Sequence, residues 1–172
     1  MAQRLAGEPV VAVYASVALR ARQTAEAIAR SHGLEVIVRD GLQEVDVGDL
    51  EGRDDLRAIE EFLSVYRSWH AGNIDVPVPG GESGQQLLDR FLPVVDRIRA
   101  EHAERNGGVV VLVSHGAAIR LTAKTLASNV DSMFADAHIV PNAGAVVLEL
   151  DDAGWQCLSW DRVAALPPGV QP

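Results

Sequence analysis

The sequence predicts an α/β fold, a three-layer α/β/α sandwich around a mostly parallel mixed sheet. Short apolar runs alternate with helical stretches along most of the chain, as in sheets whose strands are joined by crossover helices. The Val- and Leu-rich run at residues 109–113 ends at a Ser-His-Gly turn, which is typical of a strand buried on both faces of a parallel sheet. Near the C-terminus, two apolar runs flank an Asp-Asp-Ala-Gly turn and predict an antiparallel hairpin.

The predicted elements follow one another in a regular order. The run at residues 9–14 predicts the first strand, and residues 18–32 have helical periodicity that stops at Gly33. A second strand is predicted at residues 34–38. The remaining predicted elements are helices at residues 56–69, 84–105 and 117–126, separated by loops rich in Gly and Pro, and hairpin strands at residues 145–150 and 155–160.

The composition predicts one ordinary globular domain over residues 1–172. With 48% hydrophobic and 23% charged residues, a chain of 172 residues can bury a core without disulfides. The apolar runs are too short to span a membrane and the first residues lack a secretory signal, so we expect a cytoplasmic protein with no membrane partner. The formal net charge of -9 argues against a nucleic-acid partner. The single cysteine, Cys157, is expected to be a small buried side chain.

His115 stands at the tip of the predicted strand at residues 109–113. In parallel sheets, ligands bind beyond the carboxyl ends of the strands. The first amides of the following helix, together with the helix dipole, favour an anion at this place. A histidine that caps the helix or is satisfied in the core is the alternative interpretation.

Arg20 lies in the first turn of the helix that follows the first predicted strand. Two strand ends therefore offer Arg20 and His115 to one pocket, where a guanidinium can bind a phosphate through two parallel hydrogen bonds. The alternative is an exposed surface arginine, which is the interpretation we favour for the neighbouring Arg22.

The stretch at residues 41–52 is too rich in Gly and carboxylates to form a regular element, and we interpret it as a functional loop. A carboxylic acid that protonates a leaving oxygen must reach the pocket from such a loop. Glu44 is the favoured residue, because the apolar residues around it should fix its backbone. Three other carboxylates of the loop compete with it, and a solvated turn is the remaining alternative: Asp46, Asp49 and Glu51.

Together these segments resemble the histidine phosphatase superfamily, whose members include cofactor-dependent phosphoglycerate mutases and many small phosphatases. The resemblance covers nearly the whole chain and rests on motifs in the family's order: SVALRARQTA from Ser16, LQEVDVGDLEG from Leu42, PGGES from Pro79, VSHGAAIR around His115, and Asn142 before the hairpin. It implies a phosphoglycerate mutase-like fold in which Arg20 and His115 hold the transferred phosphoryl group and Glu44 donates a proton. The supporting pocket residues that it implies are Ser16, Gly116, Glu82 and Asn142.

The family's nucleophile is missing from the sequence. Members begin with a strand ending in Arg-His-Gly, whose histidine attacks phosphorus, whereas this chain starts with MAQRLAG, which resembles the end of the family's first helix. The other histidines match no motif, and we expect each to be an ordinary surface residue: His32, His70, His102 and His138. No pair of them has metal-ligand spacing on one helix face, so we infer no metal and no other cofactor.

The family's first strand lies in the interior of its sheet, and its loss has a structural cost. Backbone N–H and C=O groups of the neighbouring strands would lose their partners, and an apolar gap would open in the core. The free-energy cost would exceed the stability of an ordinary domain, which is about 5–15 kcal/mol. We therefore expect that Met1 is not the natural start and that roughly thirty residues precede it, which corresponds to one strand, its loop and most of a helix. On this hypothesis the domain is truncated and the chain as printed is inactive or weak.

The resemblance implies phosphate-ester chemistry, with a phosphatase acting on a small phosphorylated metabolite as the favoured function. The short span from the acidic loop to PGGES is similar to the phosphatase branch, and a phosphoglycerate mutase is the first alternative. The second alternative is a non-catalytic phosphate-binding relative. A homodimer is compatible with the sequence. Substrate choice would belong to a lid at residues 53–78, whose candidate contacts are Arg57, Tyr66, Arg67, Trp69 and His70.

Overall fold

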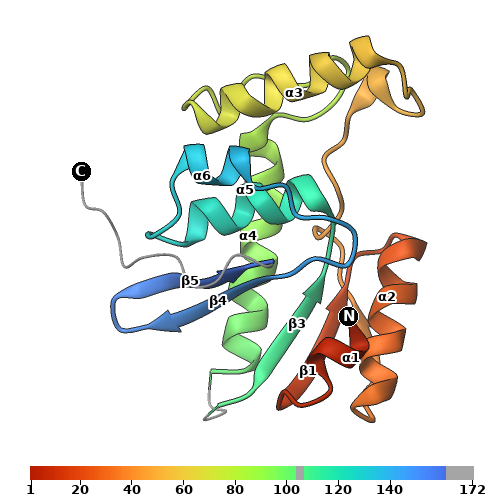
Figure 1. The fold of residues 1–172 in the computed structure, drawn as a ribbon, viewed down its shortest axis with the longest axis vertical. Helices are drawn as coiled ribbons and strands as arrows, with labels where there is room; N and C mark the ends of the chain where they lie inside the picture. The colour runs from red at the N-terminus through yellow and green to blue at the C-terminus, as the bar shows by residue number, and fades with distance from the viewer. Residues whose placement is uncertain (104–106, 162–172) are drawn as a thin grey trace. The chain divides into compact units, whose positions relative to one another are not determined.

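Two compact units, each assembled from two separate segments, make up the described part of the chain. Its helices and strands are drawn in Figure 1. The computed structural model describes residues 1–103 and 107–161. Unit 1 consists of Met1–Glu44 and Arg90–His115, and unit 2 of Val45–Asp89 and the chain from Gly116 onward. The single domain expected over residues 1–172 stays a prediction. None of the helices among the described residues is both long and apolar enough to cross a bilayer.

Unit 1 contains the parallel part of the predicted mixed sheet, and the two strands of the predicted hairpin form a separate sheet. Its strands are β1 (Val10–Ala15), β2 (Val36–Val38) and β3 (Val109–Val113), in the order β2-β1-β3. Both neighbours of β1 run parallel to it, and Val13 lies opposite Val36 on one side and Val111 on the other. The carboxyl ends of β1 and β3 therefore meet at one edge of the sheet.

Helices cover both faces of this sheet, which confirms three layers within unit 1. Side chains alternate along β1, so Val13 packs with helix α2 (Leu19–Ser31), whereas Tyr14 points to the opposite face. There the Tyr14 hydroxyl donates a hydrogen bond of 2.6 Å to Glu101 at the end of helix α4 (Gly84–Glu101). The short helix α1 (Ala2–Leu5) packs on the same side as α2.

Helix α2 shows how the sequence pattern produces this packing. Its buried residues recur at helical spacing and are mostly alanines, which allow the helix to lie close to the strands: Ala21, Ala25, Ile28 and Ala29. The predicted stop at Gly33 is confirmed, because Gly33 has a φ of 67° and the N–H of Leu34 donates to the carbonyl of Ala29 at 2.9 Å.

The prediction that β3 is buried on both faces is wrong. All five residues of β3 are only half-buried. Within unit 1, β3 pairs with β1 along one edge and with no strand along the other, so it is an edge strand of the described sheet.

Helix α4 begins at the predicted residue and belongs to both units. It ends at Glu101, and the predicted end at residue 105 lies outside the described residues. Pro93 lies inside α4 and offers no N–H to the carbonyl one turn earlier.

Unit 2 contains further helices and the predicted antiparallel hairpin, in which Val146 pairs with Trp160. Helix α6 was not predicted, because six residues are too few for a periodic pattern to appear. The elements of unit 2 besides the start of α4 are a 3₁₀ turn η1 (Gly48–Leu50), helices α3 (Leu56–His70), α5 (Gly116–Leu126) and α6 (Ser132–Ala137), and strands β4 (Val146–Asp151) and β5 (Gly154–Trp160).

The core of unit 2 joins the hairpin to α5 and α6. Trp160 is 1% exposed, and its indole N–H donates to the carbonyl of His138 at 2.9 Å. Cys157 is 2% exposed, which confirms the expected buried side chain. Burial raises the pKa of the Cys157 thiol to about 11, so thiolate chemistry is disfavoured there.

Candidate active site

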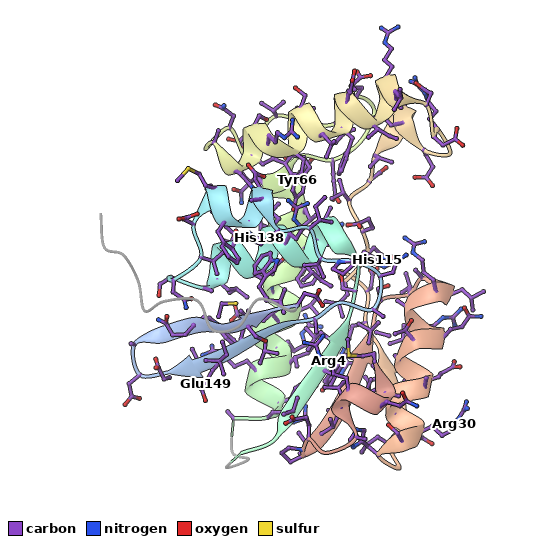
Figure 2. All side chains as sticks on the ribbon, viewed as in Figure 1. Arg4, Arg30, Tyr66, His115, His138 and Glu149 are labelled. Atoms are coloured by element: carbon purple, nitrogen blue, oxygen red, sulfur yellow. The ribbon has the colours of Figure 1, made fainter. Side chains whose placement is uncertain are left out.

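Ser16 and His115 meet where the carboxyl ends of β1 and β3 lie side by side. The N–H of Ser16 continues the ladder by donating to the carbonyl of Val113 at 3.0 Å. The Ser16 hydroxyl lies 2.8 Å from Nε2 of His115, and both side chains are buried. Figure 2 shows His115 beyond the tip of β3, the place predicted from the sequence. Parallel pairing of β1 and β3 thus brings these two residues together.

Arg20 completes this group from the first turn of α2. Its Nε donates to Nδ1 of His115 at 3.2 Å. Because a guanidinium only donates, Nδ1 is the acceptor, and the neutral ring carries its proton on Nε2 and donates it to Ser16. The terminal nitrogens of Arg20 make no hydrogen bond among the described residues, and the side chain is exposed. They are therefore available for an anion.

The charge of His115 is set by burial and by three charged neighbours. Burial lowers the pKa of His115 most, and the nearby cations Arg20 and Arg90 lower it further. The carboxylate of Glu44 acts in the opposite direction and raises this pKa. The net direction is downward, so the imidazole is neutral at neutral pH. A bound anion would favour its protonated form.

Glu44 is the one carboxylate of the predicted loop that belongs to unit 1 together with His115. Arg90, on α4, donates to the carbonyl of Glu44 at 2.8 Å. Arg90 was not among the predicted site residues, although a signal was present: Arg90 lies among buried residues of α4, next to Phe91 and three residues after Leu87. The competing carboxylates of the loop belong to unit 2: Asp46, Asp49 and Glu51.

Glu82 makes two contacts with the loop that follows Glu44. One of its carboxylate oxygens accepts a hydrogen bond of 2.9 Å from the N–H of Asp46, and its own N–H donates to the Asp46 carbonyl at 3.0 Å. Gly48 also lies against this segment, since an added Cβ there would be 2.1 Å from a backbone atom of Gly80. Within unit 2, Glu82 therefore fixes loop backbone, and its expected pocket role stays a prediction.

Gly116 and Asn142 are placed by unit 2. Gly116 is the first residue of α5, directly after His115. Asn142 is exposed in the loop before β4 and makes no hydrogen bond among the described residues. Its neighbour Ala143 has a φ of 57°, an uncommon value for a residue with a side chain. The pocket roles of Gly116 and Asn142 stay predictions.

The expectation that His70 is a surface residue is wrong. His70 is 4% exposed, and its Nδ1 lies 2.6 Å from a carboxylate oxygen of Asp136 on α6. Burial outweighs the effect of Asp136 and lowers the pKa of His70. The other histidines outside the site are partly exposed: His32, His102 and His138.

Two more of the candidate lid contacts are buried inside unit 2. The Tyr66 hydroxyl donates to the carbonyl of Ala117 at 2.8 Å, and the Trp69 indole donates to the carbonyl of Val76 at 2.6 Å. Tyr66 and Trp69 are at most 2% exposed, so the prediction that they contact a leaving group is wrong. The exposed lid candidates are the two arginines on α3, Arg57 and Arg67.

Comparison with known proteins decides the family. The family model of the histidine phosphatase superfamily (branch 1) matches residues 1–162 of the chain. The chain belongs to this superfamily. The resemblance stated from the motifs is thereby confirmed.

Relatives within and near the superfamily include phosphatases and mutases. A metal-independent phosphoserine phosphatase of Arabidopsis thaliana is 33% identical over 169 residues, which cover 96% of this chain and 68% of the relative. A 2,3-bisphosphoglycerate-dependent phosphoglycerate mutase of Parvibaculum lavamentivorans is 31% identical over 151 residues, covering 82% and 68%. The structure of a mycobacterial glucosyl-3-phosphoglycerate phosphatase complexed with VO3 has a TM-score of 0.76 at 25% identity, covering 93% of this chain and 80% of that chain. These likenesses confirm the predicted α/β fold class.

Proposed function

We propose that the protein is a phosphoric monoester hydrolase that acts on a small phosphorylated metabolite. One observation carries the proposal: Arg20, His115 and Ser16 form a hydrogen-bonded group at the carboxyl ends of two parallel strands. Although the net charge of the protein is -9, the guanidinium of Arg20 and the imidazole of His115 lie together at the edge where α/β sheets bind ligands. That arrangement suits a phosphate dianion.

Arg20 and His115 bind and orient the phosphoryl group. The terminal N–H groups of Arg20 bind two phosphate oxygens. The Nε2–H of His115 donates to Ser16, so the Ser16 hydroxyl is free to donate its own proton to the phosphate. As negative charge gathers on the equatorial oxygens in the transition state, these donors stabilise it.

Glu44 supplies the proton that the leaving group needs. A histidine nucleophile attacks phosphorus, the ester P–O bond breaks, and Glu44 gives its proton to the departing alkoxide. Water then attacks the phosphohistidine, the P–N bond breaks, and the proton that water loses returns to Glu44. Phosphate and the alcohol are the products.

The nucleophile in this proposal is not His115. Arg20 donates to its Nδ1, and its Nε2 carries a proton directed at Ser16, so neither nitrogen offers a free lone pair. The other histidines of unit 1, His32 and His102, make no hydrogen bond to the group around His115. We propose that the attacking histidine is one that the printed sequence does not contain.

A phosphatase is favoured over a mutase by the loop at residues 41–52. Its short connection to PGGES is similar to the phosphatase branch, and a relative that matches 96% of this chain is named as a phosphatase. A mutase would return the phosphoryl group to a second hydroxyl instead of releasing it to water.

The test compares two polypeptides on phenyl phosphate: the chain as printed, and a version that adds the residues encoded in frame upstream. Acid-labile phosphohistidine is trapped in parallel with radiolabelled phosphate ester. We expect turnover and a trapped phosphohistidine in the extended version only. Upstream DNA that encodes no Arg-His-Gly, or turnover by the printed chain alone, would contradict our account of the nucleophile.

Two further measurements on the same polypeptides distinguish the phosphatase from the mutase and from the non-catalytic relative. Phosphorus NMR on 3-phosphoglycerate shows whether inorganic phosphate or an isomeric ester is formed, and the ester would establish the mutase. Binding of phosphate by both polypeptides without turnover would establish the non-catalytic relative.

A further inference from the structure

Four successive carbonyls in the loop before and at Glu44 accept hydrogen bonds from side chains. Arg90 donates to Gly41 at 2.9 Å, to Gln43 at 3.0 Å and to Glu44 at 2.8 Å. The Ser114 hydroxyl donates to the carbonyl of Leu42 at 2.8 Å. A loop without ladder partners is thus fixed at every residue from 41 to 44.

Arg90 supplies three of these four bonds from a rigid element. It lies in the middle of α4, half-buried beside Phe91, and one planar guanidinium spans the three carbonyls with two of its nitrogens. A lysine has a single nitrogen at the same place and cannot reproduce the fork.

The loop approaches α4 closely only because residue 41 is glycine. An added Cβ at Gly41 would lie 2.8 Å from the carbonyl oxygen of Arg90 and 2.8 Å from a methyl group of Val94. Gly41 also has a φ of 93°, a conformation that residues with side chains rarely adopt. Sequence and geometry therefore agree that this loop rests on the Arg90 turn of α4.

We propose that Arg90 is a positioning residue, which holds the backbone of Glu44 so that its carboxyl reaches the leaving oxygen, with Ser114 in a lesser, parallel role. The inference rests on the proposed function of Glu44 as proton donor. A catalytic group must be held to within about 0.5 Å of its productive position, and a loop achieves this only when its backbone is tied to a helix or strand. Ser114 directly precedes His115, so the same strand end that places the imidazole also ties the acid loop.

The kinetic test uses the form of the protein that turns over phenyl phosphate and three variants on α4. Arg90→Gln removes the fork, Arg90→Lys keeps the charge, and Arg97→Gln is the matched control, since Arg97 is an exposed arginine on the same helix. Each is assayed on an alkyl phosphate, whose leaving group needs a proton, and on p-nitrophenyl phosphate, whose leaving group does not.

We expect Arg90→Gln to lower kcat/KM for the alkyl phosphate by about 10²-fold and for p-nitrophenyl phosphate by less than about fivefold. Arg90→Lys should recover about tenfold of the loss on the alkyl ester. Inhibition by inorganic phosphate should change by less than about twofold, because Arg20 and His115 are intact, and Arg97→Gln should match the wild type. An equal loss on both esters would overturn the inference, because it would mean general structural damage.

Gly41→Ala provides a second route to the same answer. It displaces the loop from α4 and leaves every charge in place. We expect the same selective loss on the alkyl ester. A Gly41→Ala enzyme that kept full activity on both esters would contradict the claim that this contact positions Glu44.

Hydrogen exchange on the printed chain separates this inference from the proposed function. Arg90→Gln should speed amide exchange at residues 41–46 by about tenfold and leave β1 unchanged, whereas Arg97→Gln should have no effect. Unchanged exchange in Arg90→Gln would overturn the inference whatever the activity is. If the exchange increased but no form of the protein hydrolysed either ester, the proposed function would fail while Arg90 would still be shown to fix the loop.

Discussion

The hydrogen bond from Arg20 to His115 uses one of the five N–H donors of the guanidinium. It also fixes which nitrogen of His115 carries the proton, and hence which one donates to Ser16. The sequence predicted Arg20 and His115 in one pocket because parallel strands bring their carboxyl ends to one edge, and the family resemblance implied Ser16. The sequence did not identify the partners of Ser114 and Arg90, since these are backbone carbonyls, which every residue has; only the place of Arg90 among apolar residues of α4 was a signal.

Arg20→Ala should weaken the binding of inorganic phosphate by about 10- to 100-fold, because a charge-assisted hydrogen bond contributes about 1.5–3 kcal/mol. Isothermal titration calorimetry on the printed chain measures this change in phosphate affinity. Arg22→Ala is the control, since Arg22 is exposed on the same helix and its side chain makes no hydrogen bond among the described residues. Equal effects of the two substitutions would show that only overall charge matters.

His115→Ala should lower the turnover of phenyl phosphate by about 10² or more in the catalytically competent form. The imidazole stabilises charge that develops in the transition state, so kcat should fall more than substrate binding. A loss below about threefold would reduce His115 to a structural role.

The prediction of substrate contacts on helix α3 was wrong for three residues. Tyr66, Trp69 and His70 recur at helical spacing, which places all three on the buried face of α3. They were predicted instead to be lid residues that contact the leaving group. The periodicity was the better guide. The composition of β3 alone predicted full burial, whereas its half-buried state follows from the edge that no strand of unit 1 pairs with.

The buried His70 should make the protein less stable in acid. Because its pKa in the folded state is lowered, the unfolded state binds more protons below about pH 6.5, and stability present above that pH is lost as the pH falls. Three charged groups face it: Asp136 raises this pKa, and Arg120 and Lys124 lower it. His115 contributes in the same direction, so His70→Phe should remove about half of the loss.

Urea unfolding at pH 7.5 and 5.5 measures this difference for the wild type and His70→Phe. The phenylalanine variant should show a smaller decrease in the free energy of unfolding between the two pH values. A variant with the same pH dependence as the wild type would mean that His70 is not protonated on unfolding.

Across the whole molecule, arginine side chains gather near His115 although the protein is strongly acidic. Arg20 and Arg90 both lower the pKa of His115, although the formal net charge is -9.

The fold class was predictable because alternating strands and helices leave few topologies. The division into two units was not, because it depends on contacts between distant segments. The cytoplasmic location and the homodimer stay predictions.

Sulfate, which is a dianion at both pH values, should raise the Tm of the printed chain, and more so at pH 6 than at pH 8. Binding stabilises the native state by mass action, and an anion that raises the pKa of His115 is bound together with a proton, which Nδ1 takes when the Arg20 N–H leaves that nitrogen. Scanning calorimetry with sulfate or chloride at equal ionic strength measures the shift. A sulfate effect that is the same at both pH values would exclude a titrating His115 from the binding site.

The hydrogen bond between Tyr14 and Glu101 is one of two contacts through which α4 fixes the spacing between β1 and the loop that carries Glu44. It anchors the end of the helix to β1, whereas Arg90, eleven residues earlier and about 17 Å along the axis, anchors the acid loop. The number of helical residues thereby sets the distance between β1, which ends at Ala15, and the backbone of Glu44. Inserting one residue between these anchors would turn Arg90 by about 100° away from the loop, while every residue of the site stayed the same.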